Sequence, residues 1–272
     1  MVPTPIDEDA ALLPGLVRVA RAFLNMHAVP AEIRAGGNGW TFLHDRVVQQ
    51  FRRDPAAYHQ RLIKLAEHAT DAGAHFLLLP ACAVVHTGSM HPDVQAAFAQ
   101  VPYVVAGVLD VGPHGRAYAE VREAGIVIDS FDHSSARWMG VGGVNLFAAI
   151  SMTIARVGVE GEMRSATHPP IPSAPALVFD SAHHSYTGHY IEHTIGGVVK
   201  RAGALVGDKR VAGIVSYWKS RDADSKSGWY RPEVDWITRR RVKVRWPRGG
   251  PSDFLDLIDV DFEGSGGDYG RR

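Results

Sequence analysis

The sequence predicts an α/β protein built around buried strands. Several short apolar runs have the length and the β-rich composition of strands. They are continuous rather than alternating, so each predicted strand has both faces covered. Helical patterns lie between the runs, and strands alternating with helices define the α/β class. The predicted buried strands are His75–Pro80, Val101–Leu109, Val144–Ile154, Leu177–Asp180, Val211–Trp218 and Phe254–Phe262.

The N-terminal part predicts a helix, a joint and a short strand. From Asp9 to Val29, apolar residues recur at spacings of three and four, which favours one helical face. The glycine-rich segment Ala35–Gly39 is typical of a turn or flexible joint, and a short strand is expected within Trp40–Val48. We therefore divide the chain into an N-terminal helical extension, residues 1–38, and an α/β domain, residues 39–272.

The next helix has clear start and stop signals. Asp54 is placed to cap it, Pro55 suits its first position, and Gly73 follows its end. Its predicted buried face consists of Tyr58, Leu62, Leu65, Ala66 and Ala69. Further along, Ala117–Val121 and Gly125–Asp129 resemble a hairpin, and Ile191–Leu205 has a helical pattern.

Composition excludes several classes of partner. The formal net charge is zero, with 29 basic and 29 acidic residues, so no global charge favours nucleic acid. No apolar run approaches the length of a membrane span. The N-terminus, which is acidic and proline-rich, lacks the pattern of a signal peptide. The single cysteine, Cys82, allows no internal disulfide, so we expect a cytoplasmic protein.

Several segments, taken in order, resemble the nitrilase (carbon–nitrogen hydrolase) superfamily. They are VVQ at Val47–Gln49, DAGAHFLLLPA at Asp71–Ala81, VPYVVAGVL at Val101–Leu109, the strand at Phe147–Ile150, PALVFDSA, VVKRAGAL, AGIVSYW and the closing DLIDVDF. The resemblance spans roughly Val47 to Phe262 and rests on the order of elements. It implies a nitrilase-like α-β-β-α sandwich, which often pairs sheet faces in a homo-oligomer.

The residues that the resemblance makes catalytic are not retained. The family uses a glutamate base, a lysine and a cysteine nucleophile. Ala81 stands at the glutamate position, the segment Phe131–Gly143 contains no lysine, and Ser151 is nearest to the cysteine position. Cys82 lies beside the glutamate position instead. A thioester mechanism needs a thiolate positioned by a base, and the sequence retains neither in place.

The strongest chemical candidates follow the predicted strand Leu177–Asp180. Asp180, Ser181, His183 and His184 come where this strand ends, and ligands collect at the carboxyl ends of strands. A histidine with a carboxylate partner can act as a general base, and Ser151 is the group that it would activate. The alternative interpretation is a hydrogen-bonded loop with histidines as packing residues.

Other groups have weaker signals. His189 and His193 share a helix face and match the HxxEH spacing of a zinc motif, but a solvated helix start is the preferred interpretation. For Cys82, His86 and His91 a surface loop is favoured over a metal site. The basic run Arg239–Arg248, with its flanking tryptophans, fits an exposed strand better than a surface for single-stranded nucleic acid. Gly140–Gly143 is interpreted as a turn.

These observations lead to one hypothesis and two alternatives. The leading one is a nitrilase-like hydrolase or transferase acting on a small amide, nitrile or related C–N bond, with Asp180, His183, His184 and Ser151 as catalytic residues. The alternatives are a catalytically silent binding or assembly subunit and a histidine-rich, metal-dependent enzyme. We expect a small-molecule substrate, a homo-oligomer, and no cofactor, resident metal, nucleic acid or membrane.

Overall fold

The computed structural model describes residues 15–25, 39–112, 115–132, 136–150, 174–181, 197, 199, 202, 210–219, 229–230, 237–244 and 253–262. Its helices are α1 (Gly39–Arg53), α2 (Pro55–Asp71) and α3 (Pro92–Phe98). Its strands are β1 (Leu16–Asn25), β2 (Phe76–Leu78), β3 (Val84–His86), β4 (Tyr103–Asp110), β5 (Arg116–Glu123), β6 (Ile126–Phe131), β7 (Arg137–Val141), β8 (Val144–Ile150), β9 (Ala176–Ser181), β10 (Val211–Lys219), β11 (Trp229–Tyr230), β12 (Ile237–Val244) and β13 (Asp253–Asp261).

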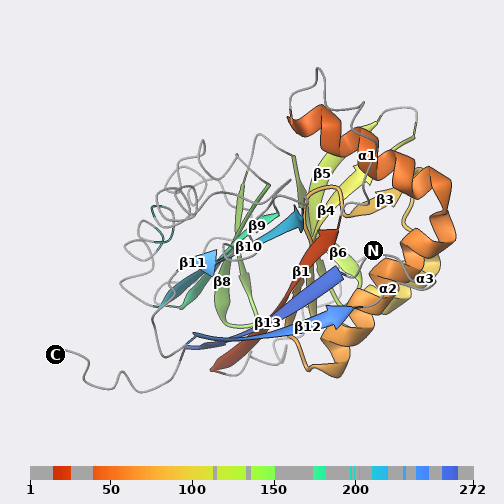
Figure 1. Cartoon of the computed structure of the whole chain (residues 1–272). Helices are drawn as coiled ribbons and strands as arrows, with labels where there is room; N and C mark the ends of the chain where they lie inside the picture. Colours follow the sequence, from red (N-terminus) through yellow and green to blue (C-terminus); the bar gives the residue numbers. More distant parts are fainter. Residues whose placement is uncertain are drawn as a thin grey trace, which may run out of the picture.

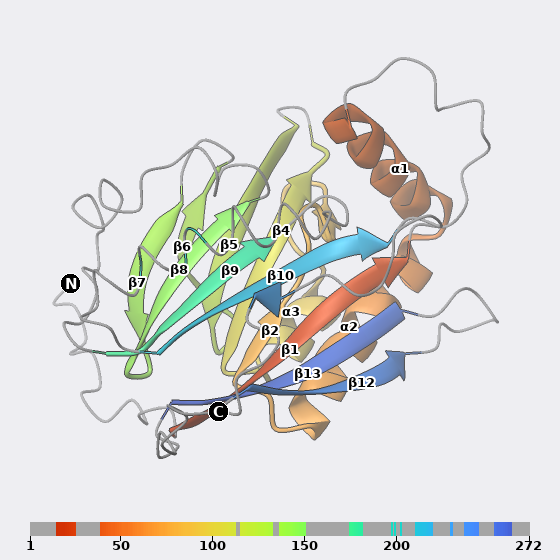
Figure 2. The same ribbon diagram turned by 60° about the vertical axis from the view of Figure 1, so that its left-hand side comes forward.

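The described strands form one hydrogen-bonded arrangement with two halves. The main path runs β6-β5-β4-β2-β1-β10-β9-β8-β7, and Figure 2 shows the strands side by side. The first half contains β1 to β6 together with β12 and β13, and the second half contains β7 to β11. They join where Phe23–Asn25 of β1 pairs in parallel with Tyr217–Lys219 of β10.

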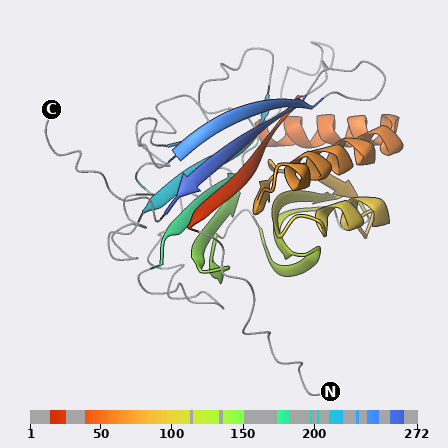
Figure 3. The same cartoon turned by 90° about the horizontal axis from the view of Figure 1, so that it is seen from below.

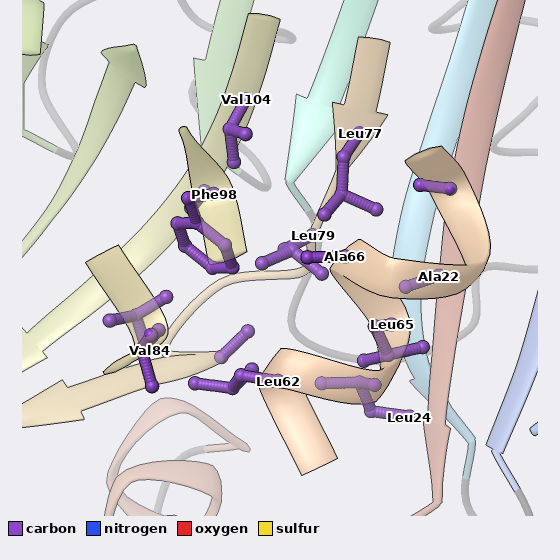
Figure 4. Close-up of a cluster of buried hydrophobic side chains, with 14 of the residues drawn as sticks. Ala22, Leu24, Leu62, Leu65, Ala66, Leu77, Leu79, Val84, Phe98 and Val104 are labelled. Carbon is purple, nitrogen blue, oxygen red and sulfur yellow. The ribbon is translucent and has the colours of Figure 1, made fainter. Parts of the chain in front are cut away.

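The helices lie together on one face of the first half (Figures 1 and 3). A helix-side core fills the space between them and this half, as Figure 4 shows for Leu62, Leu65, Leu77 and Val104. Alternate residues of the same strands point to the opposite face, because successive side chains of a strand alternate. There they meet residues of β8, β9 and β10 in an inter-sheet core, which includes Phe76, Val105, Leu146 and Phe179. The fold class is therefore α/β, as the sequence predicts.

Most predicted elements are confirmed. Asp54 caps α2 by accepting a hydrogen bond from the Ala57 N–H at 2.9 Å, and all five predicted residues of its inner face are buried. The predicted strands correspond to β2, β4, β8, β9, β10 and β13, and the hairpin to β5 and β6. Of the predicted turn Gly140–Gly143, Gly142 and Gly143 form the turn between β7 and β8, both with positive φ, whereas Gly140 belongs to β7. In the predicted helix Ile191–Leu205, residues 197, 199 and 202 are described, and all three are helical.

Two predictions for the N-terminal part are wrong. Leu16–Asn25, predicted as helix, is the strand β1, which pairs with β2, β10 and β13. Because both faces of β1 are covered, it is apolar at odd and even positions alike, and such a run also contains helical spacings. This strand belongs to the same sheet as the domain predicted to begin at residue 39, so this part of residues 1–38 is not a helical extension.

The second error concerns Trp40–Val48, predicted as strand, which lies in α1. The helix buries Val47 and Val48, and Phe51 packs beside them one turn further on. The segment Val47–Gln49, which resembles the opening of the superfamily, is therefore helical, and β1 is the first strand of the described chain. None of the described helices is long and apolar enough to cross a membrane.

Candidate functional site

Ala81, which the resemblance places at the family's glutamate position, lies in a sharp bend after β2. We call Pro80–Ala83 the Pro80 bend. The Ala83 N–H donates to the Pro80 carbonyl at 3.2 Å, and Cys82 has a φ of 57°, in the left-handed region that non-glycine residues seldom adopt. Ala81 belongs to the inter-sheet core and Cys82 to the helix-side core, each 1% exposed. The bend thus crosses from one core to the other.

A glycine on the neighbouring strand permits this path. A Cβ atom on Gly107 of β4 would lie 2.3 Å from the Ala81 Cα and 2.6 Å from the Pro80 carbonyl oxygen. No side chain fits at such distances, so β4 and the Pro80 bend are in direct backbone contact. The glycine in the apolar run Val101–Leu109 was the only sequence signal for this approach, because a glycine inside a strand often marks close backbone contact.

Side chains from other elements hydrogen-bond to the carbonyl groups of the bend. The Trp218 indole N–H of β10 donates to the Ala81 carbonyl at 2.6 Å, and the Tyr58 hydroxyl of α2 donates to the Ala83 carbonyl at 2.9 Å. Burial raises the pKa of Tyr58, which keeps the hydroxyl a donor. Burial also raises the pKa of the Cys82 thiol to about 12, so this thiol stays protonated and unreactive.

Two serines make similar contacts between the halves of the sheet. Ser181 at the end of β9 donates to the Leu79 carbonyl at 2.9 Å, and Ser216 of β10 donates to the Ala22 carbonyl at 2.7 Å. Both serines are fully buried. We call this set of contacts, together with the Trp218–Ala81 bond, the strand-end junction. It satisfies buried carbonyl groups that would otherwise cost free energy.

Asp180 lies next to this junction but on the opposite face of β9. Leu177 and Phe179 point into the inter-sheet core, and Ser181 points toward Leu79. By alternation, Asp180 points to the outer face of the second half. In the register of the sheet, its neighbours are Ala149 of β8 and Val215 of β10, and it is 1% exposed. A buried carboxylate is thus present at the carboxyl end of β9.

The remaining predicted site residues, Ser151, His183 and His184, lie outside the described residues, as do His189 and His193. Of the four predicted catalytic residues, Asp180 is the one that lies within the described part of the chain. The roles of all four stay predictions.

The group Cys82, His86 and His91 is not assembled. The thiol is in the helix-side core, while the His86 imidazole contacts the Tyr118 hydroxyl at 3.3 Å. The His91 Nδ1 atom caps α3 by accepting from the Asp93 N–H. Within the described part of the chain, no three His, Cys, Asp or Glu side chains are arranged to hold a metal ion. The basic run is strand over Ile237–Val244, where β12 pairs with β13.

Sequence reasoning missed Gly107, Trp218, Ser216 and Arg21. The Arg21 guanidinium, fully buried, donates to the Val215 carbonyl at 3.2 Å and to the Asp256 carboxylate at 2.6 Å. These residues connect strands that are distant in sequence, so only the assembled sheet reveals their partners.

Comparison with known proteins identifies the fold. No protein-family model matches the chain, and no curated protein sequence matches it significantly. Among solved structures, a mutant of the Nesterenkonia AN1 amidase from the nitrilase superfamily matches with a TM-score of 0.50 and 11% identity, over 92% of this chain and 93% of that one. The glutamine-dependent NAD+ synthetase from Acinetobacter baumannii matches more weakly, with a TM-score of 0.44 and 14% identity, over 74% of this chain and 38% of that one. The match to the amidase shows that the chain has the nitrilase-superfamily fold.

Proposed function

We propose that this protein is a nitrilase-fold hydrolase or transferase, acting on a small amide, nitrile or related C–N bond without the family's glutamate and cysteine. The observation that carries the proposal is the buried carboxylate of Asp180 at the carboxyl end of β9, followed in sequence by His183 and His184. A buried carboxylate is well suited to fix the tautomer of a histidine, since hydrogen bonds are stronger where water is excluded.

The proposed roles follow from this pairing. Asp180 orients His184, and His184 takes the proton from the Ser151 hydroxyl or from a water molecule as that oxygen attacks the carbonyl carbon. The same imidazole then gives the proton to the departing nitrogen, and the C–N bond breaks. If water is the nucleophile, the products are a carboxylic acid and an amine. If Ser151 is the nucleophile, the amine leaves an acyl ester on its oxygen, and a water molecule activated by the same imidazole then hydrolyses this ester to the carboxylic acid and restores the hydroxyl. His183 is the neighbouring imidazole and would bind the substrate or replace His184 as base.

The experiment is a screen for ammonia or amine release from short amides, nitriles and N-carbamoyl compounds, using purified wild type. On any substrate that is turned over, Asp180→Asn and His184→Ala are then compared with His68→Ala, a control on the exposed face of α2. We expect His184→Ala to lower kcat by about 10²–10⁴-fold with the fold retained, and His68→Ala to leave kcat unchanged. Turnover that is equal in all four proteins would remove Asp180 and His184 from the mechanism.

A second candidate is a catalytically silent subunit retained for binding or assembly. The Pro80 bend favours it, because Ala81 and the protonated Cys82 supply neither the base nor the nucleophile at that position. This candidate predicts no turnover of any compound in the screen. It also predicts that Asp180→Asn changes only the free energy of unfolding, measured by urea denaturation.

A further inference from the structure

A histidine ring joins the start of β2 to β1. The His75 backbone N–H donates to the Arg18 carbonyl at 2.8 Å, and the Arg18 backbone N–H donates to the Nδ1 atom of the His75 imidazole at 2.9 Å. These two bonds extend the parallel pairing of β1 with β2, which begins with Val19 and Phe76. The ring nitrogen takes the part of a backbone carbonyl here, because the His75 carbonyl accepts from the Tyr103 N–H of β4 at 3.0 Å.

The donor of this hydrogen bond determines the state of the ring. A backbone N–H can only donate, so the Nδ1 atom of His75 must have a free lone pair and no proton. The ring is therefore neutral in the folded protein, with its proton on Nε2. A protonated imidazole has an N–H on both nitrogens, so Nδ1 would then face the Arg18 N–H as a second donor. Protonation of His75 thus removes the bond to β1.

Arg18 is also bound by two other elements. Its guanidinium donates to both carboxylate oxygens of Asp259 on β13, at 2.6 and 2.8 Å, and to the Ala72 carbonyl after α2 at 2.6 Å. The side chain thus joins β1 to β13 and to the end of α2. With its side chain held in this way, Arg18 cannot turn its backbone N–H to another protein acceptor when the imidazole is protonated.

The charges around the ring favour its neutral form. Burial lowers the pKa of His75 and the Arg18 guanidinium lowers it further, whereas the Asp259 carboxylate raises it. Among the described residues these two side chains are the charged groups that act on the ring. The elements α2 and β4 contribute backbone groups to this corner, the Ala72 carbonyl and the Tyr103 N–H.

The sign of the pH dependence follows from this lowered pKa. An unfolded histidine has a pKa of about 6.5, so near this pH the unfolded chain binds more protons at His75 than the folded protein does. The stabilisation that the neutral ring provides is therefore complete above about pH 6.5. It is lost as the pH falls from there through the pKa of the folded state.

We propose that Arg18 and His75 form an acid-sensitive latch between β1 and β2, which is closed while the imidazole is neutral and opens when it is protonated. The other end of β1, Phe23–Asn25, pairs with β10 and so connects the two halves of the sheet. Opening of the latch loosens this central strand from β2. The latch is independent of the proposed reaction, because none of the proposed catalytic residues takes part in it.

Wild-type protein tests the latch by nuclear magnetic resonance. The ring-nitrogen shifts of His75 should show an unprotonated Nδ1 at pH 7.5. Hydrogen exchange of the Arg18 amide, corrected for the intrinsic effect of pH, is compared with that of Val178 in the middle of β9. From pH 7.5 to pH 5.5, the protection of Arg18 relative to Val178 should fall by at least about threefold. A proton on Nδ1, or a ratio that does not change with pH, would overturn the proposal.

A matched pair of variants tests the same latch through stability. His75→Asn puts an amide oxygen in the place of Nδ1, so it keeps an acceptor that does not titrate. Between pH 8 and pH 5.5, its midpoint of thermal unfolding should fall by at least about 2 °C less than that of wild type. His68→Asn, which removes an exposed histidine of α2, should fall as much as wild type.

His75→Ala separates the acceptor from the charge. It removes the acceptor at every pH, so its midpoint of thermal unfolding at pH 8 should lie about 2–4 °C below that of wild type. Equal pH dependence of wild type and His75→Asn would show that this ring is not the acid-sensitive group. The exchange measurement on wild type decides the question even if a variant at position 75 folds poorly.

Discussion

The Pro80 bend and the end of β9 occupy corresponding places at the carboxyl ends of two strands, but their chemistry is opposite. At the Pro80 bend, Ala81 and Cys82 are buried, the bend's carbonyl groups accept hydrogen bonds from Trp218 and Tyr58, and β4 contacts the backbone through Gly107. At the end of β9, a serine joins the strand-end junction on one face while the Asp180 carboxylate lies on the other.

The comparison indicates where a reaction can take place. A base or a nucleophile must present an ionisable group in a suitable protonation state. The Pro80 bend has no carboxylate, and its thiol stays protonated. The end of β9 has a carboxylate, and the reaction proposed above uses that carboxylate and no group of the Pro80 bend.

The largest expected effect comes from placing the family's carboxylate in the bend. Ala81→Glu should lower the free energy of unfolding by about 4 kcal/mol or more, because a carboxylate is brought into the inter-sheet core without a partner. Burial would raise the pKa of the new carboxyl, so it would also be a poor general base near neutral pH. Urea denaturation followed by tryptophan fluorescence measures the loss.

A matched control is Ala56→Glu, in the exposed first turn of α2, where a negative charge near the helix N-terminus should be neutral or slightly stabilising. If Ala81→Glu were as stable as wild type, the bend would have room for a carboxylate, and the contrast with β9 would fail.

The close approach of β4 gives the next largest effect. Gly107→Ala should destabilise the protein by about 3 kcal/mol, since the added methyl meets backbone atoms of Pro80 and Ala81 that cannot move independently. Gly115→Ala is the control, because the nearest atom to its added Cβ is 3.9 Å away. Similar midpoints of thermal unfolding for the two variants would contradict the backbone contact.

Much of the fold could be predicted from sequence because its signals are local. Asp54, Pro55 and the apolar spacing of α2 fix that helix, and the continuous apolar runs indicate strands covered on both faces. The same coverage caused the error at β1. A strand with apolar residues on both of its faces fits the period of a helix as well as that of a strand, and the neighbours of β1, which are β2, β10 and β13, are 50 residues or more away in sequence.

The site could be predicted only in part. Asp180 is found at the carboxyl end of a buried strand, as predicted, but its face is decided by the register of β8, β9 and β10. The sequence places Asp180 and Ser181 side by side, whereas the sheet turns them to opposite faces. The roles of Trp218 and Ser216 depend on carbonyl groups in strands that are distant in sequence, and no local pattern encodes such partners.

The strand-end junction has a smaller expected effect. Ser181→Ala and Trp218→Phe each leave a buried carbonyl without its donor, so each should cost about 1–3 kcal/mol of unfolding free energy. Ser130→Ala, on the exposed edge of β6, should cost less than about 0.5 kcal/mol. Chemical denaturation of the three variants ranks them. A loss below about 0.5 kcal/mol for both junction variants would mean that these hydrogen bonds do not hold the halves together.

The smallest effect is expected at Cys82, and it tests the conclusion that the Pro80 bend is chemically inert. Because burial raises the pKa of this thiol to about 12, the reactive thiolate is scarce at pH 8, and the 1% exposure excludes reagents. Labelling with iodoacetamide should therefore proceed only through unfolding, and its rate should rise with urea along the unfolding curve. Cys82→Ala should keep any activity found in the substrate screen within a few-fold, since the thiol is a small packing residue. Val127→Cys supplies an exposed thiol as the positive control, which should react at once in the folded protein. Rapid labelling of the native Cys82, or a covalent adduct with a substrate, would show that the Pro80 bend contains an accessible thiolate. Cys82 would then be the candidate nucleophile.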